Sequence, residues 1–143
     1  MEEKIIVNTD GGARGNPGPA ASAFVVKKGN EVIFKKGFYL GETTNNIAEY
    51  TAVLKALEWL KENNFVDKEI FFEIDSELVV RQLTGIYKVK NFQLRVLYQK
   101  IKDLEKSFLN GIFYRHIFRE KNFLADKIVN EKIDESQVAF TSG

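Results

Sequence analysis

The sequence has no cysteine and only one histidine among its 143 residues. The lack of cysteine excludes disulfide bonds and thiolate metal sites, and it is typical of proteins in a reducing compartment. No apolar run approaches the length of a membrane span, and the first residues, MEEKIIVN, lack the basic and apolar parts of a secretory signal. We therefore expect one domain over residues 1–143 that works in the cytoplasm without membrane contact.

Proline is also scarce, and both prolines stand in one short stretch. This stretch, residues 7–24, reads VNTDGGARGNPGPAASAF and also holds four of the ten glycines. They follow Asp10, which stands just beyond the apolar run 5–7, a predicted buried strand. A simple turn needs one or two glycines, so the stretch predicts either an irregular loop or a backbone that comes very close to something else.

The molecule as a whole has almost no excess of positive or negative charge, since its net charge is only +1. Its distribution is uneven, however, because the segment 78–102 contains no acidic residue. Tyr87, Phe92 and Tyr98 lie among its cations, a mixture that suits a polyanion with flat bases. A solvated helix face is the simpler interpretation of the segment taken alone. The cations are Arg81, Lys88, Lys90, Arg95, Lys100 and Lys102.

Hydrophobic periodicity predicts the element order β-β-β-α-β-α-α-β-α. Gly29 and Asn30 predict a hairpin turn, Ser76 and Asn122 are expected to cap helices, and Gly85 ends the second helix. A leading meander followed by strand–helix alternation implies an α/β fold with a mixed sheet flanked by helices. The predicted strands are 5–7, 21–28, 31–40, 69–76 and 111–118, and the predicted helices are 46–62, 77–85, 92–108 and 122–133.

Four acidic residues occupy corresponding places in these elements. Asp10 and Asp75 end strands, Glu49 lies about one turn into the first helix, and Asp126 opens the last helix. If the first and fourth strands are parallel neighbours, Asp10 and Asp75 lie together at the sheet edge that binds ligands in α/β folds. Each acid also has a structural explanation: Asn46 and Glu49 resemble a capping box, and a helix start favours negative charge at Asp126. Asp75 could likewise support a helix cap, whereas Asp10 is harder to explain because aspartate is depleted in strands.

Carboxylates that converge at one sheet edge repel one another unless a cation is bound. A site of oxygen ligands, in a chain without cysteine and with one histidine, points to Mg²⁺ or Mn²⁺ rather than Zn²⁺ or Cu²⁺. Two such ions are a common device for displacement at phosphorus. The pattern therefore predicts a phosphodiesterase, provided that the carboxylates do converge.

Four ordered segments resemble the motifs of the cellular type 1 ribonucleases H. They read TDGGARGNPGPAASAFVV, TTNNIAEYTAVLKALEWL, IDSELVVRQLTG and REKNFLADKIVN, and together they span residues 9 to about 130. The resemblance implies a ribonuclease H-like fold with a five-stranded mixed sheet. It also implies a two-metal site of Asp10, Glu49, Asp75 and Asp126, with Mn²⁺ as a substitute for Mg²⁺. The implied reaction is cleavage of the RNA strand of RNA–DNA hybrids, leaving 3′-hydroxyl and 5′-phosphate ends.

The resemblance also implies which residues bind nucleic acid. Glycines 11, 12 and 15 would let the backbone approach the ribose hydroxyls in the minor groove of a hybrid. The short segment LTGIYKVKNFQLRVL leaves no room for a full basic handle, as in archaeal and plant-like members, so its cations become a reduced substrate grip. The implied binding residues are Gly11, Gly12, Arg14, Asn16, Thr44, Asn45 and Asn46, with Lys88, Lys90 and Arg95 in the grip.

His116 stands ten residues before Asp126, the spacing of an auxiliary histidine in well-known bacterial members. Theirs lies in a flexible loop, whereas His116 falls in a predicted strand, which favours a structural role. Arg119 and Glu120 compete for the auxiliary role.

The expected partner is an RNA–DNA hybrid, with double-stranded RNA as a further candidate, and we expect a monomer. A binding module that does not cut and a nuclease for other substrates, such as a junction resolvase, remain alternatives. The complete acid set disfavours the first, and the glycine-rich stretch with Asn45 and Asn46 disfavours the second.

Overall fold

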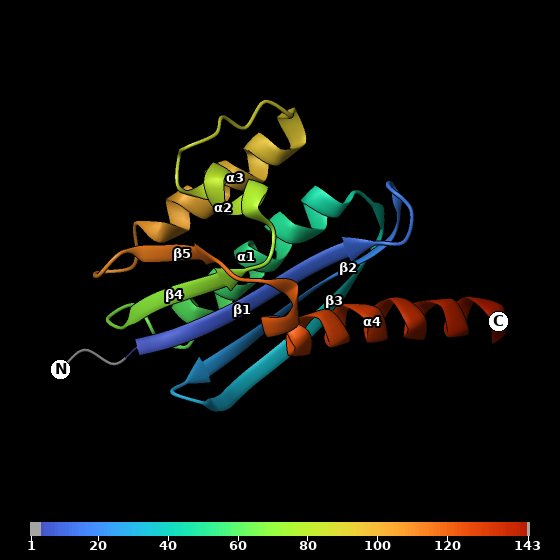
Figure 1. The fold of residues 1–143 in the computed structure, drawn as a ribbon, viewed down its shortest axis with the longest axis horizontal. Helices are drawn as coiled ribbons and strands as arrows, with labels where there is room; N and C mark the ends of the chain where they lie inside the picture. The colour runs from blue at the N-terminus through green and yellow to red at the C-terminus, as the bar shows by residue number, and fades with distance from the viewer. Residues whose placement is uncertain (1–3, 143) are drawn as a thin grey trace.

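Strand β1 (Lys4–Ala13) lies at the centre of a five-stranded sheet with the order β3-β2-β1-β4-β5 (Figure 1). β2 (Gly18–Lys28) and β3 (Glu31–Thr43) complete an antiparallel meander. β4 (Glu69–Ile74) and β5 (Ile112–His116) continue the sheet on the other side in parallel. The computed structural model describes residues 4–142, with side chains as far as Val138. This topology confirms the predicted α/β fold with a mixed sheet.

Helices cover both faces of the sheet (Figure 1). α1 (Asn45–Glu62), α2 (Glu77–Leu83) and α3 (Phe92–Glu105) enclose the larger core with one face. α4 (Phe123–Ser142) packs on the opposite face against β2 and its neighbours, after the short 3₁₀ turn η1 (Arg119–Lys121). Within residues 4–142, no helix has both the length and the apolar character that a membrane crossing requires.

The alternation of side chains along β1 determines which helix each residue faces. Ile5 and Val7 are fully buried in the core under α1. Gly11 has the same parity and lies against Ala48 of α1, whereas Gly12 lies against Val129 of α4. Asp10 shares the parity of Gly12, so β1 presents its carboxylate on the side where α4 packs.

Several boundaries differ from the sequence prediction. β1 continues through the glycines to Ala13, because Gly11 and Gly12 pair with Ser22 and Ala21 of β2. The glycine-rich stretch is therefore a strand end followed by a tight turn, and the prediction of a loop directly after Asp10 is wrong. Similarly, α4 runs to residue 142 instead of 133, through a segment without a clear periodic signal.

The predictions from local turn and cap residues agree with the structure at three places. Gly29 and Asn30 form the β2–β3 hairpin turn, with Gly29 at a φ of +62°. The Ser76 hydroxyl accepts from the Val79 N–H at 3.3 Å and caps α2, and Gly85 follows the end of that helix at a φ of +82°. The structure confirms these predictions. They could be made from the sequence because each feature depends on contacts within four residues.

Candidate active site

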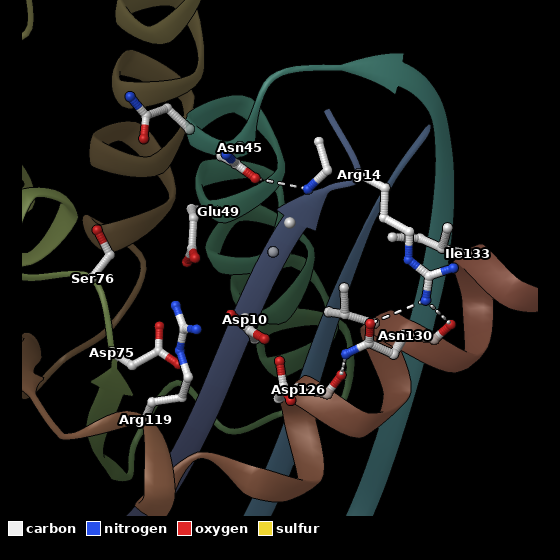
Figure 2. Close-up of a pocket in the computed structure, with 15 residues that line it drawn as sticks. Asp10, Arg14, Asn45, Glu49, Asp75, Ser76, Arg119, Asp126, Asn130 and Ile133 are labelled. Carbon is white, nitrogen blue, oxygen red and sulfur yellow. Dashed lines mark hydrogen bonds between the residues drawn. The ribbon is translucent and has the colours of Figure 1, made fainter. Parts of the chain in front are cut away.

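Three carboxylates from three different elements converge at the carboxyl end of β1. Asp10 of β1, Glu49 of α1 and Asp75 at the end of β4 each offer an oxygen, and these oxygens all lie within 4.8 Å of one another (Figure 2). Asp10 and Glu49 are buried, and Asp75 is half-buried. The convergence on which the metal hypothesis depended is therefore present.

Gly11 allows α1 to approach β1 closely enough to bring Glu49 to Asp10. A Cβ atom on Gly11 would lie 2.2 Å from the Ala48 carbonyl carbon and 2.4 Å from the Glu49 nitrogen. The buried Ser22 hydroxyl fixes the same helix turn by donating to the Ala48 carbonyl oxygen at 2.6 Å. The absence of a side chain at Gly11 thus has an internal reason, which is helix–strand contact.

The electrostatics of the cluster oppose full ionisation. Burial, then the charges of Asp75 and Asp126, raises the pKa of Asp10 from 3.8 to about 8, against a hydrogen bond from Gly11 that lowers it. Burial, then the charges of Asp10 and Asp75, raises the pKa of Glu49 well above its usual value. Within the described residues, Glu49 Oε2 is buried and has no hydrogen-bond partner. A divalent cation would satisfy this oxygen and offset the repulsion, so the residues present fit such an ion.

Asp126 and Arg119 complete the walls of the site. A hollow of about 410 Å³ is lined by the three converging carboxylates together with Asp126, Ser76 and Arg119. Asp126 stands in the first turn of α4 and faces Asp10, and Arg119 points into the same hollow (Figure 2). The structure thus brings all four predicted carboxylates to one cavity, which the cations Arg14 and Arg119 also line.

The turn after β1 and the start of α1 are joined by two amide side chains. The Ala13 N–H donates to Asn45 Oδ1 at 2.8 Å, and the Asn45 N–H donates to Asn16 Oδ1 at 3.0 Å. Thr44 caps α1 by accepting from the Ile47 N–H at 3.2 Å. Asn46 is therefore not the cap, and the capping-box explanation of Glu49 is wrong. Of these residues, Asn45 and Asn46 line the hollow that holds the carboxylates.

Arg14 is held by α4. Its guanidinium donates to Asp134 Oδ1 at 2.6 Å and to Asn130 Oδ1 at 3.1 Å, and its side chain is 44% exposed (Figure 2). The pairing with Asp134 neutralises part of the charge that a phosphate would use. Gly12 and Gly15 lie in the end of β1 and in the following turn, where Gly15 has a φ of +95°.

The basic segment forms a second hollow of about 480 Å³, separate from the carboxylates. Lys88 and Arg95 line it together with the rings of Tyr87 and Tyr98. Lys90 is exposed but does not line this hollow.

His116 and Glu120 lie outside the lining of the carboxylate hollow. His116 is the last residue of β5, is exposed, and makes an edge contact with Phe118 at 5.9 Å between ring centroids. The prediction that His116 belongs to a strand is confirmed. Of the three auxiliary candidates, only Arg119 lines the hollow.

Two residues of the site were missed or misassigned from the sequence. Ser22 was read only as part of a strand, and Asn122 was read as a helix cap. The buried Asn122 side chain instead donates to the Thr9 carbonyl oxygen at 2.8 Å and to Asp75 Oδ2 at 3.2 Å. The sequence did show that both residues are polar and stand in or beside buried segments. It could not show their hydrogen-bond partners, which lie 26 to 113 residues away.

Comparison with known proteins agrees with this geometry. The family described as "Reverse transcriptase-like" matches residues 8–132. A ribonuclease HI of Halobacterium salinarum is 37% identical over 128 residues, which are 89% of this chain and 63% of that protein. A bifunctional protein of Mycobacterium tuberculosis is 34% identical over 92% of this chain, but the chain spans only 36% of that protein's length.

Solved structures agree in fold over almost the full chain. A ribonuclease H1 isolated from compost superposes with a TM-score of 0.90 at 45% identity, covering 94% of this chain and 99% of that one. The same compost protein in complex with an RNA/DNA hybrid superposes with a TM-score of 0.89 at 44% identity. By sequence and by fold, the chain belongs to the type 1 ribonuclease H family.

Proposed function

We propose that the protein is a divalent-metal-dependent endoribonuclease that hydrolyses the RNA strand of RNA–DNA hybrids and leaves 3′-hydroxyl and 5′-phosphate ends. The observation that carries the proposal is the convergence of Asp10, Glu49 and Asp75 within 4.8 Å, with Asp126 in the same hollow. Buried acids that repel one another destabilise a protein, so the cluster is best explained by a ligand that supplies positive charge among them.

Asp10, Glu49, Asp75 and Asp126 would hold the metal, with two ions of Mg²⁺ as the expected occupants and Mn²⁺ as a substitute. When bound, the ions activate the attacking water and stabilise the leaving oxygen. The carboxylates set the place of the reaction at the mouth of the hollow. Arg119 lines the hollow and would offer its guanidinium to a phosphate or to the departing product (Figure 2).

The substrate would be oriented by the polar border of the hollow. Asn45 and Asn46 line it, and Asn16 is tied to Asn45, so a hybrid lying across β1 would meet amide groups at its minor groove. Lys88 and Arg95 would hold phosphates at the second hollow, and Tyr87 and Tyr98 would offer ring faces. We include Gly11, Gly12, Arg14 and Thr44 among the substrate-facing residues as part of the proposal.

The test is cleavage of end-labelled RNA–DNA hybrid, double-stranded RNA and double-stranded DNA in Mg²⁺, with wild type beside Asp75→Asn. Asp75→Asn keeps the shape of the side chain but removes a charged ligand, so we expect hybrid cleavage to fall at least about 100-fold. The matched control is Asp67→Asn, which changes an exposed aspartate outside the hollow and should leave cleavage unchanged.

Equal cleavage by wild type and Asp75→Asn would overturn the assignment of the metal site. Hybrid binding without cleavage in Mg²⁺ or Mn²⁺ would favour the non-cutting binding module. Preferred cleavage of double-stranded DNA would instead point to a nuclease of another substrate class.

A further inference from the structure

We propose that Asn122 is a positioning residue that holds the Asp75 carboxylate in the orientation needed for metal binding. The inference rests on the proposed function, because it assumes that Asp75 is a metal ligand. Asn122 is 1% exposed and does not line the carboxylate hollow, so it acts on a metal or substrate only through Asp75 and its neighbours.

The Asn122 side chain uses its amide as a double donor. An asparagine NH₂ carries two hydrogens, and Nδ2 of Asn122 lies 2.8 Å from the Thr9 carbonyl oxygen and 3.2 Å from Asp75 Oδ2. The first bond anchors the amide to the backbone of β1, which is paired with β2 and β4 at this point. The second then directs the anchored amide at one oxygen of Asp75 and restrains rotation of that carboxylate.

The position of Asn122 connects three of the four carboxylates. Thr9 immediately precedes Asp10 in β1, and Asp126 is joined to Asn122 by a backbone hydrogen bond of 3.1 Å from its N–H to the Asn122 carbonyl oxygen. One residue therefore contacts the backbone beside Asp10, the side chain of Asp75 and the helix turn that carries Asp126. Loss of the side chain would remove the bonds to Thr9 and Asp75, whereas the backbone bond to Asp126 and the pairing of β1 with β4 would remain.

A purely structural role as a helix cap does not account for this arrangement. A capping side chain accepts from the first turn of its helix, but within the described residues Asn122 Oδ1 is buried and has no partner. An unpaired buried acceptor destabilises the fold. What the asparagine contributes is thus its pair of donors, one of which is directed at a proposed metal ligand.

Asn8 offers a matched control within the same sheet. It is also buried, its Nδ2 donates to a carboxylate oxygen, Glu73 Oε1, at 3.1 Å, and its Oδ1 also lacks a partner among the described residues. Glu73 does not line the carboxylate hollow. Asn8→Ala therefore removes one amide–carboxylate bond of the kind that Asn122→Ala also removes, and only Asn122→Ala touches the proposed metal site.

The experiment measures Mg²⁺ and Mn²⁺ binding to the nucleic-acid-free protein by calorimetry, for wild type, Asn122→Ala, Asn122→Leu and Asn8→Ala. Residues that orient metal ligands typically change metal affinity 10–100-fold when removed, so we expect the Kd for Mn²⁺ to rise at least about 10-fold in both Asn122 variants. Asn8→Ala is expected to stay within about 2-fold of wild type. Asn122→Leu keeps most of the side-chain volume, so it guards against effects of a cavity.

A second measurement needs only wild-type protein and so does not depend on whether the variants fold. The side-chain amide signals of Asn122 and Asn8 are followed by NMR during a Mg²⁺ titration. The Asn122 signal is expected to shift with the Kd found by calorimetry, and the Asn8 signal is expected to remain in place. An Asn122 signal that does not respond, or equal metal affinities in wild type and folded Asn122 variants, would overturn the proposal.

These outcomes separate this inference from the proposed function. A wild-type protein that binds metal through Asp75 but does not cleave hybrid would leave the positioning role standing and remove the ribonuclease activity. If wild type cleaves hybrid but the Asn122 variants bind metal as well as wild type, the ribonuclease activity stands and the positioning role of Asn122 is removed. A comparable loss of affinity in Asn8→Ala would show that the effect is one of general stability.

Discussion

Asp10 stands in surroundings that oppose its own charge. It is only 6% exposed, lies within 4.8 Å of oxygens from Glu49 and Asp75, and has Asp126 opposite. These factors place its pKa at about 8, so in the metal-free protein Asp10 is largely protonated below neutral pH. A carboxyl group in this state is poised to exchange its proton for a metal ion.

The raised pKa of Asp10 predicts how stability depends on pH. The folded protein retains the Asp10 proton up to about pH 8, whereas the unfolded chain releases it near pH 3.8, so the free energy of unfolding falls between these values. Asp10→Asn removes this dependence. In EDTA at pH 8.5 we expect the variant to be more stable than wild type by about 1 kcal/mol or more, with a smaller difference at pH 4.

Urea unfolding at both pH values measures the effect, with Asp67→Asn as an exposed control that should follow wild type. Adding Mg²⁺ at pH 8.5 should raise the stability of wild type more than that of Asp10→Asn, because the variant has lost a ligand. A wild-type protein that gains stability between pH 4 and 8 in EDTA, relative to Asp10→Asn, would contradict the raised pKa.

The contact between β1 and α1 decides whether the site can assemble. Ala48 approaches Gly11 closely, and its carbonyl oxygen accepts from Ser22 of β2, so the first turn of α1 is fixed on two strands at once. Glu49 follows directly and is thereby delivered to Asp10. The missing side chain of Gly11 and the hydroxyl of Ser22, on neighbouring strands, thus place Glu49 in the site.

Gly11→Ala is predicted to move α1 away from β1. The added Cβ would lie 2.2 Å from a backbone carbon, which cannot yield as a flexible side chain would. We expect a loss of about 1–3 kcal/mol in the free energy of unfolding, together with weaker Mn²⁺ binding because Glu49 is displaced. Urea unfolding and calorimetry measure the two effects.

Gly12→Ala is the matched control for the unfolding measurement, because its Cβ would meet only Val129 Cγ1 at 3.8 Å. Its stability should stay within about 0.5 kcal/mol of wild type. If both substitutions were equally tolerated, the close approach of α1 would not be what makes Gly11 necessary.

Across the whole molecule, the near-zero net charge conceals two separate regions of opposite sign. The acids gather in the hollow at the end of β1, and the exposed Lys88 and Arg95 gather in the hollow formed by the segment before α3 and by α3 itself. A polyanion could therefore be held by the second region while the first acts on it with metal bound. The net charge by itself does not predict this separation of acidic and basic regions.

The double variant Lys88→Ala/Arg95→Ala is predicted to weaken binding of a hybrid without changing chemistry. Each lost phosphate contact reduces the slope of log K against log salt by about 0.7–0.9, so the slope should fall by up to about 1.8. Fluorescence anisotropy over a salt series measures the slope, and single-turnover cleavage at saturating hybrid should stay near wild type. Lys35→Ala/Lys61→Ala removes two exposed lysines outside both hollows as a control; equal slopes in the two double variants would argue against a specific grip.

The sequence by itself determined the order of strands and helices and the identity of the four carboxylates. Periods of two and of about 3.6 residues, together with local caps such as Ser76 and turns such as Gly29-Asn30, depend on neighbours a few residues apart, so they can be read directly. Asp10 stood out because aspartate is depleted in strands, whereas Asp75 also had an explanation as support for a helix cap. The family resemblance supplied the remaining step from acids to ribonuclease activity.

The reason why Gly11 lacks a side chain and the partners of Asn122 became visible only in the folded protein. Gly11 and Asn122 depend on contacts between residues 37 to 113 positions apart, and no local pattern encodes such distances. Arg14 shows the same limit, since its partner Asp134 lies 120 residues away. Local sequence fixes which groups are available, but the free energy of packing an entire sheet between two helical layers fixes which of them meet.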